Sequence, residues 1–374
     1  MIPPYFFSII ILLPAKINRY KQIDKNISIA FLVNYDIFML KEALRGNMIM
    51  QKVTWGVLGT AGIAKGCTIP GMQQAENCRL YAIASRSAQK AEAFKETFGF
   101  EKAYGSYAAL LADPEVEAVY IPLPNDMHYD WVLKALKAGK HVLCEKPLAP
   151  TVSQIKQMFQ VAKENNVLLM EAFAYLHSPI VSAVKQEIED GKLGQIRYME
   201  SAFITSDYDI RNIRMRKETF GGATYDLGCY NTSQILWMLG EEPERVQAVA
   251  DFSEEGVDMC TTGLLSFASG AKATFQCAMV LETDADRRID RFQIHGTLGE
   301  IRSEARFNQD GNMTYTIRSA EETTVKTVSA RQNYALEVEQ FGRCITQGEN
   351  PHVSEDFSLM NARVLERVLS AIAY

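Results

Sequence analysis

The chain lacks an excess of basic residues, a long apolar run and any Cys-x-x-Cys pair. Its 39 Lys and Arg against 45 Asp and Glu give a formal net charge of −6. This balance argues against general nucleic-acid binding, which depends on an excess of Lys and Arg. The seven cysteines are odd in number and lie mostly in apolar runs. We therefore expect buried thiols in a cytoplasmic protein, with neither disulfides nor a metal site.

The first 50 residues differ from the rest of the chain. Their apolar run at residues 5–13 is too short to span a membrane, and it lacks the basic flank and cleavage site of a secretory signal. We expect residues 1–50 to be a poorly packed N-terminal extension. Alternatively, the natural start is Met48 or Met50, because Met50 leads directly into the first expected strand.

From residue 53 onward, short apolar runs alternate with helical patterns. Strand-like runs lie at residues 53–58, 79–84, 118–123, 141–144 and 167–173. Such alternation predicts a doubly wound parallel sheet with right-handed crossovers. Because 374 residues exceed what one hydrophobic core usually serves, we expect two domains. The first is a dinucleotide-binding Rossmann domain over residues 51–172.

The second half of the chain has a different rhythm. A helix at 180–190 and a strand at 196–204 precede the region around Tyr230. Further β-type runs lie at 246–252, 261–267, 271–279, 291–295 and 314–317, and helical patterns lie at 334–346 and 357–373. Ser269-Gly270 separates two of these runs like a hairpin turn. We predict an α+β domain over residues 173–374 with a mostly antiparallel open sheet.

A glycine turn follows the first expected strand. It consists of Gly59, Thr60, Ala61, Gly62, Ile63 and Ala64. A dinucleotide turn needs small residues at three places. The first is the end of the strand, the second is where the backbone meets the pyrophosphate, and the third is where the helix packs on the strand. Gly59, Ala61 and Ala64 occupy those places. Ala61 departs from the usual glycine, although Gly62 beside it restores some room.

The second expected strand ends at Ser85-Arg86-Ser87, without a neighbouring Asp or Glu. A carboxylate at this point binds the ribose hydroxyls of NAD, whereas an arginine accommodates the 2′-phosphate of NADP. We therefore predict that Ser85 and Arg86 bind NADP in preference to NAD. Alternatively, Arg86 is a solvated loop residue.

Polar residues also follow the next expected strands of the first domain. Pro124 and Asn125 lie at the carboxyl edge where such sheets bind ligands, and His128 follows three residues later. Asn125 can bind a ribose or carboxamide, while His128 either faces the ligand or has a structural role. Glu145-Lys146 stands at the end of another strand and supplies a candidate proton-handling lysine.

Asp226 and Tyr230 stand at i and i+4 on a later helical segment, so they share a face. Oxidation of an alcohol requires hydride departure to a nicotinamide while a base takes the hydroxyl proton. A free phenol, with a pKa of about 10, is a poor base at neutral pH. We expect the Lys146 ammonium and the cationic nicotinamide together to lower the pKa of Tyr230.

Over residues 51–374 the chain resembles the glucose-fructose oxidoreductase, inositol dehydrogenase and MocA family. The resemblance rests on five motifs in this order: the glycine turn, Pro-Asn-x-x-His, Glu-Lys-Pro, Glu171-Ala-Phe and Gly-Gly…Asp-x-Gly-x-Tyr. The tyrosine at position 230 makes the chain similar to the branch of this family that contains dimeric dihydrodiol dehydrogenase and NADP-dependent xylose dehydrogenase. The resemblance implies that Lys146 is the catalytic lysine and Tyr230 the acid/base, with Asp226 one turn earlier.

Many relatives have Arg and His after the Glu-Ala-Phe motif, whereas this chain has Tyr175-Leu-His177. We expect Tyr175, His177 and Arg214 to contact the substrate along with Lys146, Asp226 and Tyr230. The alternative for Arg214 is a solvated loop, because it belongs to a run of charges at 211–217.

The expected function is NADP-dependent dehydrogenation or reduction of a sugar, polyol or vicinal diol. Two alternatives remain open, a non-catalytic NADP-binding regulator and a glycoside hydrolase that uses bound NAD. Both faces of the second sheet include apolar residues at 264–267 and 273–275, so we also expect a homodimer or a dimer of dimers.

Overall fold

The computed structural model describes residues 51–206, 208–281 and 288–374. By backbone contacts, residues 52–374 group as one compact unit. The predicted N-terminal extension at residues 1–50 lies outside the described residues. In the described part of the chain, no helix combines the length and apolar character needed to cross a membrane.

The first sheet is parallel, with strand order β3-β2-β1-β4-β5-β6. Its strands are β1 Val53–Leu58, β2 Cys78–Ala84, β3 Lys102–Tyr104, β4 Ala118–Ile121, β5 His141–Glu145 and β6 Leu169–Ala172. Its helices are η1 Ala64–Thr68, α3 Ile69–Gln74, α4 Ala88–Phe98, α5 Tyr107–Leu111, α6 Asn125–Lys137 and α7 Val152–Glu164. This order confirms the predicted doubly wound fold. Every residue of β1 is buried, as its apolar sequence indicates.

The second sheet has the order β14-β13-β12-β11-β7-β10-β9-β8 and is antiparallel except between β7 and β10. Its strands are β7 Ile196–Ser206, β8 Arg245–Phe252, β9 Asp258–Ser266, β10 Lys272–Leu281, β11 Ile289–Gly296, β12 Gly299–Ser303, β13 Gly311–Ser319 and β14 Thr323–Ala330. The predicted mostly antiparallel sheet and the hairpin at Ser269-Gly270 are confirmed, with a φ of 88° at Gly270.

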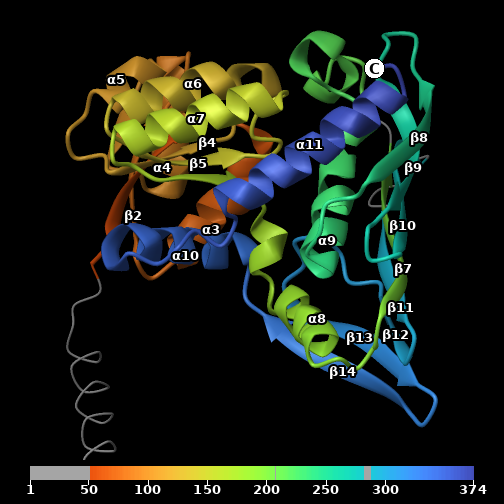
Figure 1. Ribbon diagram of the computed structural model, residues 1–374. Coiled ribbons are helices and arrows are strands. Elements are labelled where there is room, and N and C mark those ends of the chain that lie inside the picture. Colours follow the sequence, from red (N-terminus) through yellow and green to blue (C-terminus); the bar gives the residue numbers. More distant parts are fainter. Residues whose placement is uncertain (1–50, 207, 282–287) are drawn as a thin grey trace, which may run out of the picture. The chain divides into compact units, whose positions relative to one another are not determined.

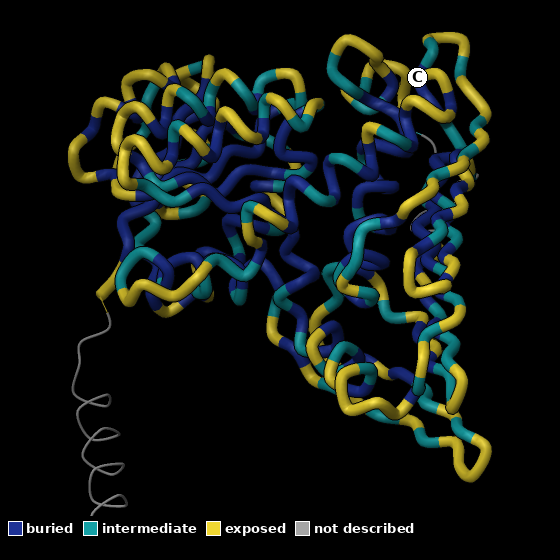
Figure 2. Tube along the Cα trace, viewed as in Figure 1, coloured by how far each residue is buried: buried dark blue, intermediate teal, exposed yellow. Residues whose placement is uncertain are grey.

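Helices α8 Pro179–Glu189, α9 Cys229–Leu239 and α11 Glu355–Ala371 lie on one side of this sheet (Figure 1). Short helical turns connect the strands and helices: η2 Ala174–His177, η3 Ile213–Met215, η4 Lys217–Thr219 and η5 Thr224–Gly228. Burial varies from residue to residue along the strands of the second sheet (Figure 2). On β9 and β10, Leu265 and Phe275 are buried while Leu264 is exposed.

The helix α10 Asn333–Gln347 returns to the first sheet from the end of the chain. Its Phe341 ring lies 5.8 Å from the Trp55 ring of β1, and a Cβ on Gly71 of α3 would lie 2.8 Å from Tyr334. The first sheet therefore includes a helix that is distant in sequence. The predicted domain boundary between residues 172 and 173 stays a prediction.

Candidate active site

A cleft of about 770 Å³ lies at the carboxyl edge of the parallel sheet. This volume is in the range of small-molecule and cofactor sites. Of the predicted site residues, it brings together Gly59, Ala61, Gly62, Ile63, Ser85, Arg86, Pro124, Asn125, Glu145, Lys146, Arg214, Asp226 and Tyr230. The cleft thus joins the glycine turn to the candidate catalytic residues.

The glycine turn has the backbone that a dinucleotide phosphate requires. Gly59 has a φ of +125°, where a side chain would be strained, and its N–H donates to the carbonyl of Ala84 at 2.9 Å. A Cβ on Gly62 would meet nothing within 4 Å, so the turn is open toward the cleft. Ala64 is fully buried and does not line the cleft, which leaves it the packing role of the third small residue rather than a cofactor contact.

The end of the cleft at β2 carries two cations, Arg86 and Lys90, together with Ser85, Ser87 and Tyr107. Ser87 caps α4 by accepting a hydrogen bond from the backbone N–H of Lys90 at 3.3 Å. Burial raises the pKa of Tyr107, and the neighbouring Arg86 guanidinium acts in the opposite direction. Among the described residues, no carboxylate lines this end, which suits a phosphate.

Asn125 and His128 both lie on α6, but only Asn125 lines the cleft. The Asn125 side chain donates to the carbonyl of Phe220 at 2.9 Å and lines the cleft. His128 is fully buried, with Nδ1 2.9 Å from the Pro147 carbonyl and Nε2 2.7 Å from the Leu123 carbonyl. The cofactor contact predicted for His128 is therefore wrong, because both ring nitrogens are already in contact with backbone carbonyls. Its role is to connect two loops of the cleft.

Lys146, Asp226, Arg214 and Tyr230 form a charged cluster at the other end of the cleft. The Lys146 ammonium donates to the Asp226 carbonyl at 2.7 Å and to its Oδ1 at 3.1 Å. Asp226 Oδ2 accepts from Arg214 Nε at 2.6 Å. The Lys146 ammonium also lies 4.7 Å from the centroid of the Tyr230 ring. Lys146 directly follows β5, whereas Arg214, Asp226 and Tyr230 lie in η3, η5 and α9, and the four residues were predicted to share a ligand.

The charges of this cluster are strongly coupled. Burial alone would raise the pKa of Asp226, but Arg214 and Lys146 hold it well below its usual value. Burial alone would lower the pKa of Lys146, yet Asp226 raises it above the usual value. Burial raises the pKa of Tyr230, and Lys146 acts in the opposite direction. Burial outweighs the ammonium, so the pKa of Tyr230 lies above its usual value, while the contribution of Lys146 has the predicted sign.

The start of the helical segment that carries Asp226 and Tyr230 is held by a buried carboxylate of β9, Asp258. Asp258 is fully buried, and its Oδ2 accepts from the backbone N–H of Thr224 at 2.8 Å and from the hydroxyls of Thr224 and Thr261 at 2.7 Å each. A Cβ on Gly222, whose φ is +93°, would lie 2.1 Å from Asp258 Oδ1. The second glycine of the Gly-Gly pair is therefore needed for close approach to this carboxylate.

Tyr175 and His177 lie behind the cleft rather than in it. The Tyr175 hydroxyl shares a hydrogen bond of 2.7 Å with Ser233 Oγ, and its ring lies 5.5 Å from the Tyr230 ring. His177 is half-buried and its ring lies 4.8 Å from the His352 ring, with its pKa well below the usual value because of burial. The substrate contacts predicted for these two residues are wrong, because η2 directs them into the protein core. Tyr175 instead supports the Tyr230 helix.

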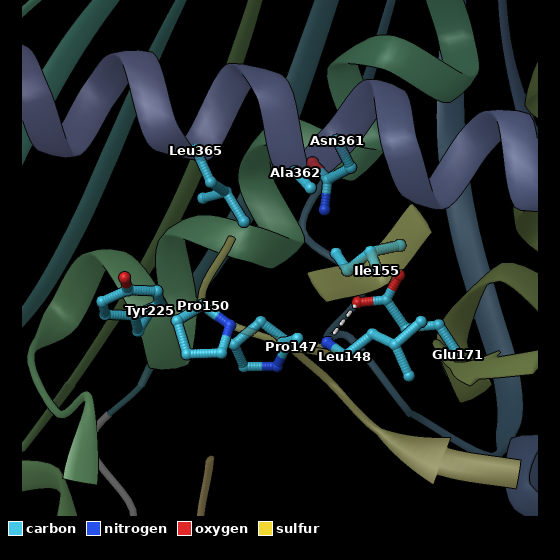
Figure 3. A pocket seen from close by; sticks show the side chains of 10 residues that line it. Pro147, Leu148, Pro150, Ile155, Glu171, Tyr225, Asn361, Ala362 and Leu365 are labelled. Carbon is cyan, nitrogen blue, oxygen red and sulfur yellow. Dashed lines mark hydrogen bonds between the residues drawn. The ribbon is translucent and has the colours of Figure 1, made fainter. Parts of the chain in front are cut away.

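Two buried carboxyls support the Lys146 strand end. Glu145 Oε1 accepts from the Tyr120 hydroxyl at 2.6 Å. Glu171 Oε1 accepts from the backbone N–H of Leu148 at 2.9 Å, beside a cavity of about 10 Å³ (Figure 3). Burial raises the pKa of both, for Glu171 to about 7. That cavity holds no more than about one water molecule, so it is a feature of packing rather than a ligand site.

Sequence reasoning missed several residues of the cleft. Thr60, Lys90, Tyr107, Thr219 and Phe220 also line it. Lys90 stands one turn after the Ser87 cap, which is a signal that could have been used. Tyr107 follows the unpredicted strand β3, so its position could not be inferred. Asp258 gave no signal, because it lies 28 residues after Tyr230 on another sheet.

Two family models match the chain. Residues 53–173 match an oxidoreductase family with an NAD-binding Rossmann fold, and residues 181–302 match the GFO/IDH/MocA C-terminal domain. The D-xylose 1-dehydrogenase (NADP(+)) 2 of Haloferax volcanii is 35% identical over 324 residues, covering 84% of this chain and 95% of that protein. The dTDP-3,4-didehydro-2,6-dideoxy-alpha-D-glucose 3-reductase of Actinomadura kijaniata is 30% identical over 315 residues, covering 84% and 93% respectively.

A solved structure has the same fold. The crystal structure of a 3-ketoreductase from Actinomadura kijaniata in complex with NADP and TDP-benzene matches with a TM-score of 0.80 at 29% sequence identity. The match covers 86% of this chain and 98% of that chain. It therefore includes both sheets.

Proposed function

Because this chain belongs to the GFO/IDH/MocA family of NAD-binding oxidoreductases, we propose that it transfers a hydride between NADP(H) and a carbon of a sugar, polyol or vicinal diol. The observation that carries this proposal is the single cleft, which joins the glycine turn to Lys146 and Tyr230. Bound NADP(H) supplies the hydride acceptor or donor.

The residues of the cleft suit that cofactor from end to end. Arg86 and Lys90 would hold the 2′-phosphate, the open turn at Gly62 would face the pyrophosphate, and Asn125 would bind a ribose or carboxamide. The nicotinamide end would then lie toward Lys146. This direction follows from the order of the strands, because β2 and β5 lie on opposite sides of β1.

Tyr230 would transfer the proton of the substrate hydroxyl. In oxidation, its phenolate takes that proton, and in reduction its phenol returns one. Lys146 would stabilise the phenolate and the developing alkoxide, since an ammonium favours both negative charges. Asp226 would orient Lys146 through its carbonyl and Oδ1.

The substrate class can be tested directly. The relatives described above act on D-xylose and on a dTDP-linked keto sugar, and a relative from Xenopus laevis is a trans-1,2-dihydrobenzene-1,2-diol dehydrogenase. A panel of aldoses, inositols and aromatic dihydrodiols with NADP and NAD, followed by nicotinamide absorbance, should find at least one substrate with net turnover. Tight NADP binding without turnover on any member would favour a regulator instead.

Removing the guanidinium of Arg86 should change cofactor preference. We expect Arg86→Ala to weaken NADP binding by roughly tenfold or more while sparing NAD, because a charge-assisted contact to phosphate would be lost. Calorimetric titration of both cofactors checks this. Arg79→Ala is the matched control, since Arg79 lies on β2, the strand that Arg86 follows, and pairs with Glu101 away from the cleft. Tighter binding of NAD than of NADP by the unmodified protein would rule out the assignment.

We also propose that the protein is a cytosolic homodimer or dimer of dimers that associates through the second sheet. Several apolar side chains are exposed on its strands, with fractions of 72% for Val249, 38% for Leu264, 48% for Val280 and 65% for Val325. A second copy can cover such a face by symmetry. All seven cysteines are free, as expected in a reducing compartment.

Light scattering should report at least a dimer at micromolar concentration. Val249→Glu, which adds a charge to this face, should shift the protein toward monomer, because a buried unpaired charge opposes association. Asp130→Glu on α6 is the control, since it keeps the charge of a helix outside the second sheet. A monomeric wild-type protein would contradict the proposal.

A further inference from the structure

Asp226 is contacted by two cations at once, and this arrangement determines the charge beside Tyr230. Lys146 binds the carbonyl and Oδ1, while Arg214 binds Oδ2. A lysine and an aspartate alone would form a neutral pair. With Arg214 included, the three groups have a net charge of +1, because one carboxylate is shared between an ammonium and a guanidinium.

The backbone around Arg214 fixes its guanidinium at this place. The Arg214 N–H donates to Asn212 Oδ1 at 3.0 Å, and its carbonyl accepts from the N–H of Gly222 at 2.8 Å. A Cβ on Gly221 would lie 2.3 Å from that carbonyl oxygen. The guanidinium also lies 5.0 Å from the centroid of the Tyr208 ring. Arg214 is thus tied to the segment that begins the Tyr230 helix.

The other charged groups near Tyr230 do not supply the same charge. Arg288, on the side of β11, forms its own ion pair with Asp290. Glu145 is buried and its pKa is raised, which disfavours its negative charge. Cys229, Tyr175 and Tyr334 also interact electrostatically with Tyr230, and they are uncharged thiols and phenols from neighbouring elements. Arg211, which also lines the cleft, forms its own ion pair with Asp209. The cation at this end of the cleft therefore depends on the Lys146, Asp226 and Arg214 cluster.

We infer that Arg214 is a positioning residue that, by binding the second oxygen of Asp226, gives the cluster of Lys146, Asp226 and Arg214 a net positive charge beside Tyr230. This inference rests on the proposed function and deepens it. The substrate contact predicted for Arg214 from the sequence stays a prediction, because Arg214 lines the cleft while its Nε is engaged by Asp226.

The charge can be measured without substrate, because oxidised NADP has a cationic nicotinamide and NADPH a neutral one. Arg214→Met should lower the ratio of the Kd for oxidised NADP to the Kd for NADPH by roughly fivefold, since one repulsive charge is lost from the end of the cleft where the nicotinamide would lie. Arg214→Gln, which keeps a donor for Asp226 but no charge, should do the same. Arg214→Lys should keep the ratio within about twofold of the wild-type value, because it keeps the charge.

Arg216→Met is the matched control, because Arg216 is an exposed residue of the same segment and does not line the cleft. The ratio of the two cofactor Kd values should be the same in Arg216→Met as in the wild type. An unchanged ratio in both Arg214→Met and Arg214→Gln, in preparations with normal thermal melting, would overturn the inference.

With a substrate in hand, Arg214→Met should reduce kcat by roughly tenfold with little change in KM, as expected for an interaction that acts in the transition state. A raised KM with unchanged kcat would instead identify Arg214 as a direct substrate contact and overturn the inference. If no substrate is found, the proposed function fails, while the ratio of the two cofactor affinities still decides the role of Arg214.

Discussion

Tyr230→Phe should reduce turnover by roughly a hundredfold or more while leaving NADPH affinity nearly unchanged. The hundredfold scale is the usual contribution of a positioned acid or base. The substitution removes only the hydroxyl, and the Tyr230 ring packs against Phe203 at 5.4 Å and Phe307 at 5.2 Å, so a phenylalanine ring fits the same place. The measurement is kcat against fluorescence-monitored NADPH binding in the same preparation.

Tyr225→Phe is the control for this experiment. Tyr225 belongs to the same helical segment and does not line the cleft. It should keep normal turnover. Near-normal turnover in Tyr230→Phe would remove Tyr230 from the mechanism, and Lys146 would then be the better candidate for proton transfer, because His177 lies behind the cleft.

Lys146→Met should reduce turnover by roughly a hundredfold or more, and it should also weaken cofactor binding at the nicotinamide end. Methionine keeps much of the apolar stem but removes the ammonium. Without this ammonium, the pKa of Tyr230 should rise further, because Lys146 opposes the effect of burial on that phenol. The rate of oxidation, which needs the phenolate, should therefore shift to higher pH, and a pH profile of kcat checks this sign.

Lys156→Met, on the exposed side of α7, is the matched control and should leave both turnover and binding unchanged. Thermal melting of each variant separates a lost catalytic group from an unfolded site. Retention of full turnover by a folded Lys146→Met protein would contradict the role assigned to this lysine.

The parts of the fold that could be predicted are those with strong apolar periodicity. β1 is buried on both faces and appears in the sequence as a continuous apolar run. β3 is only three residues long and half-exposed. Along β14, exposed residues alternate with half-buried ones, many of them polar. Neither strand therefore has a clear apolar pattern in the sequence. The return of α10 to the first sheet could not be predicted, because periodicity shows that a helix has an apolar face but not which sheet it covers.

The site shows the same division. Gly59, Lys146 and Tyr230 belong to short motifs at strand or helix ends, where chain order alone places them at one edge of the sheet. His128 was misplaced because a sequence shows an imidazole but not the two carbonyls that face its nitrogens. Asp258 was missed because its contact with Thr224 depends on the pairing of distant strands.

The transfer of a deuterium label tests the central proposal most directly. Once the panel has identified a substrate, that substrate labelled with deuterium at the reacting carbon should be incubated with the protein and excess oxidised NADP. The released cofactor should be examined by mass spectrometry. We predict that free NADPH carries one deuterium per product molecule, and that Tyr230→Phe forms it at least roughly a hundredfold more slowly. Product formation without labelled NADPH in solution would contradict the account, because it would mean that the cofactor only binds or is recycled within the site.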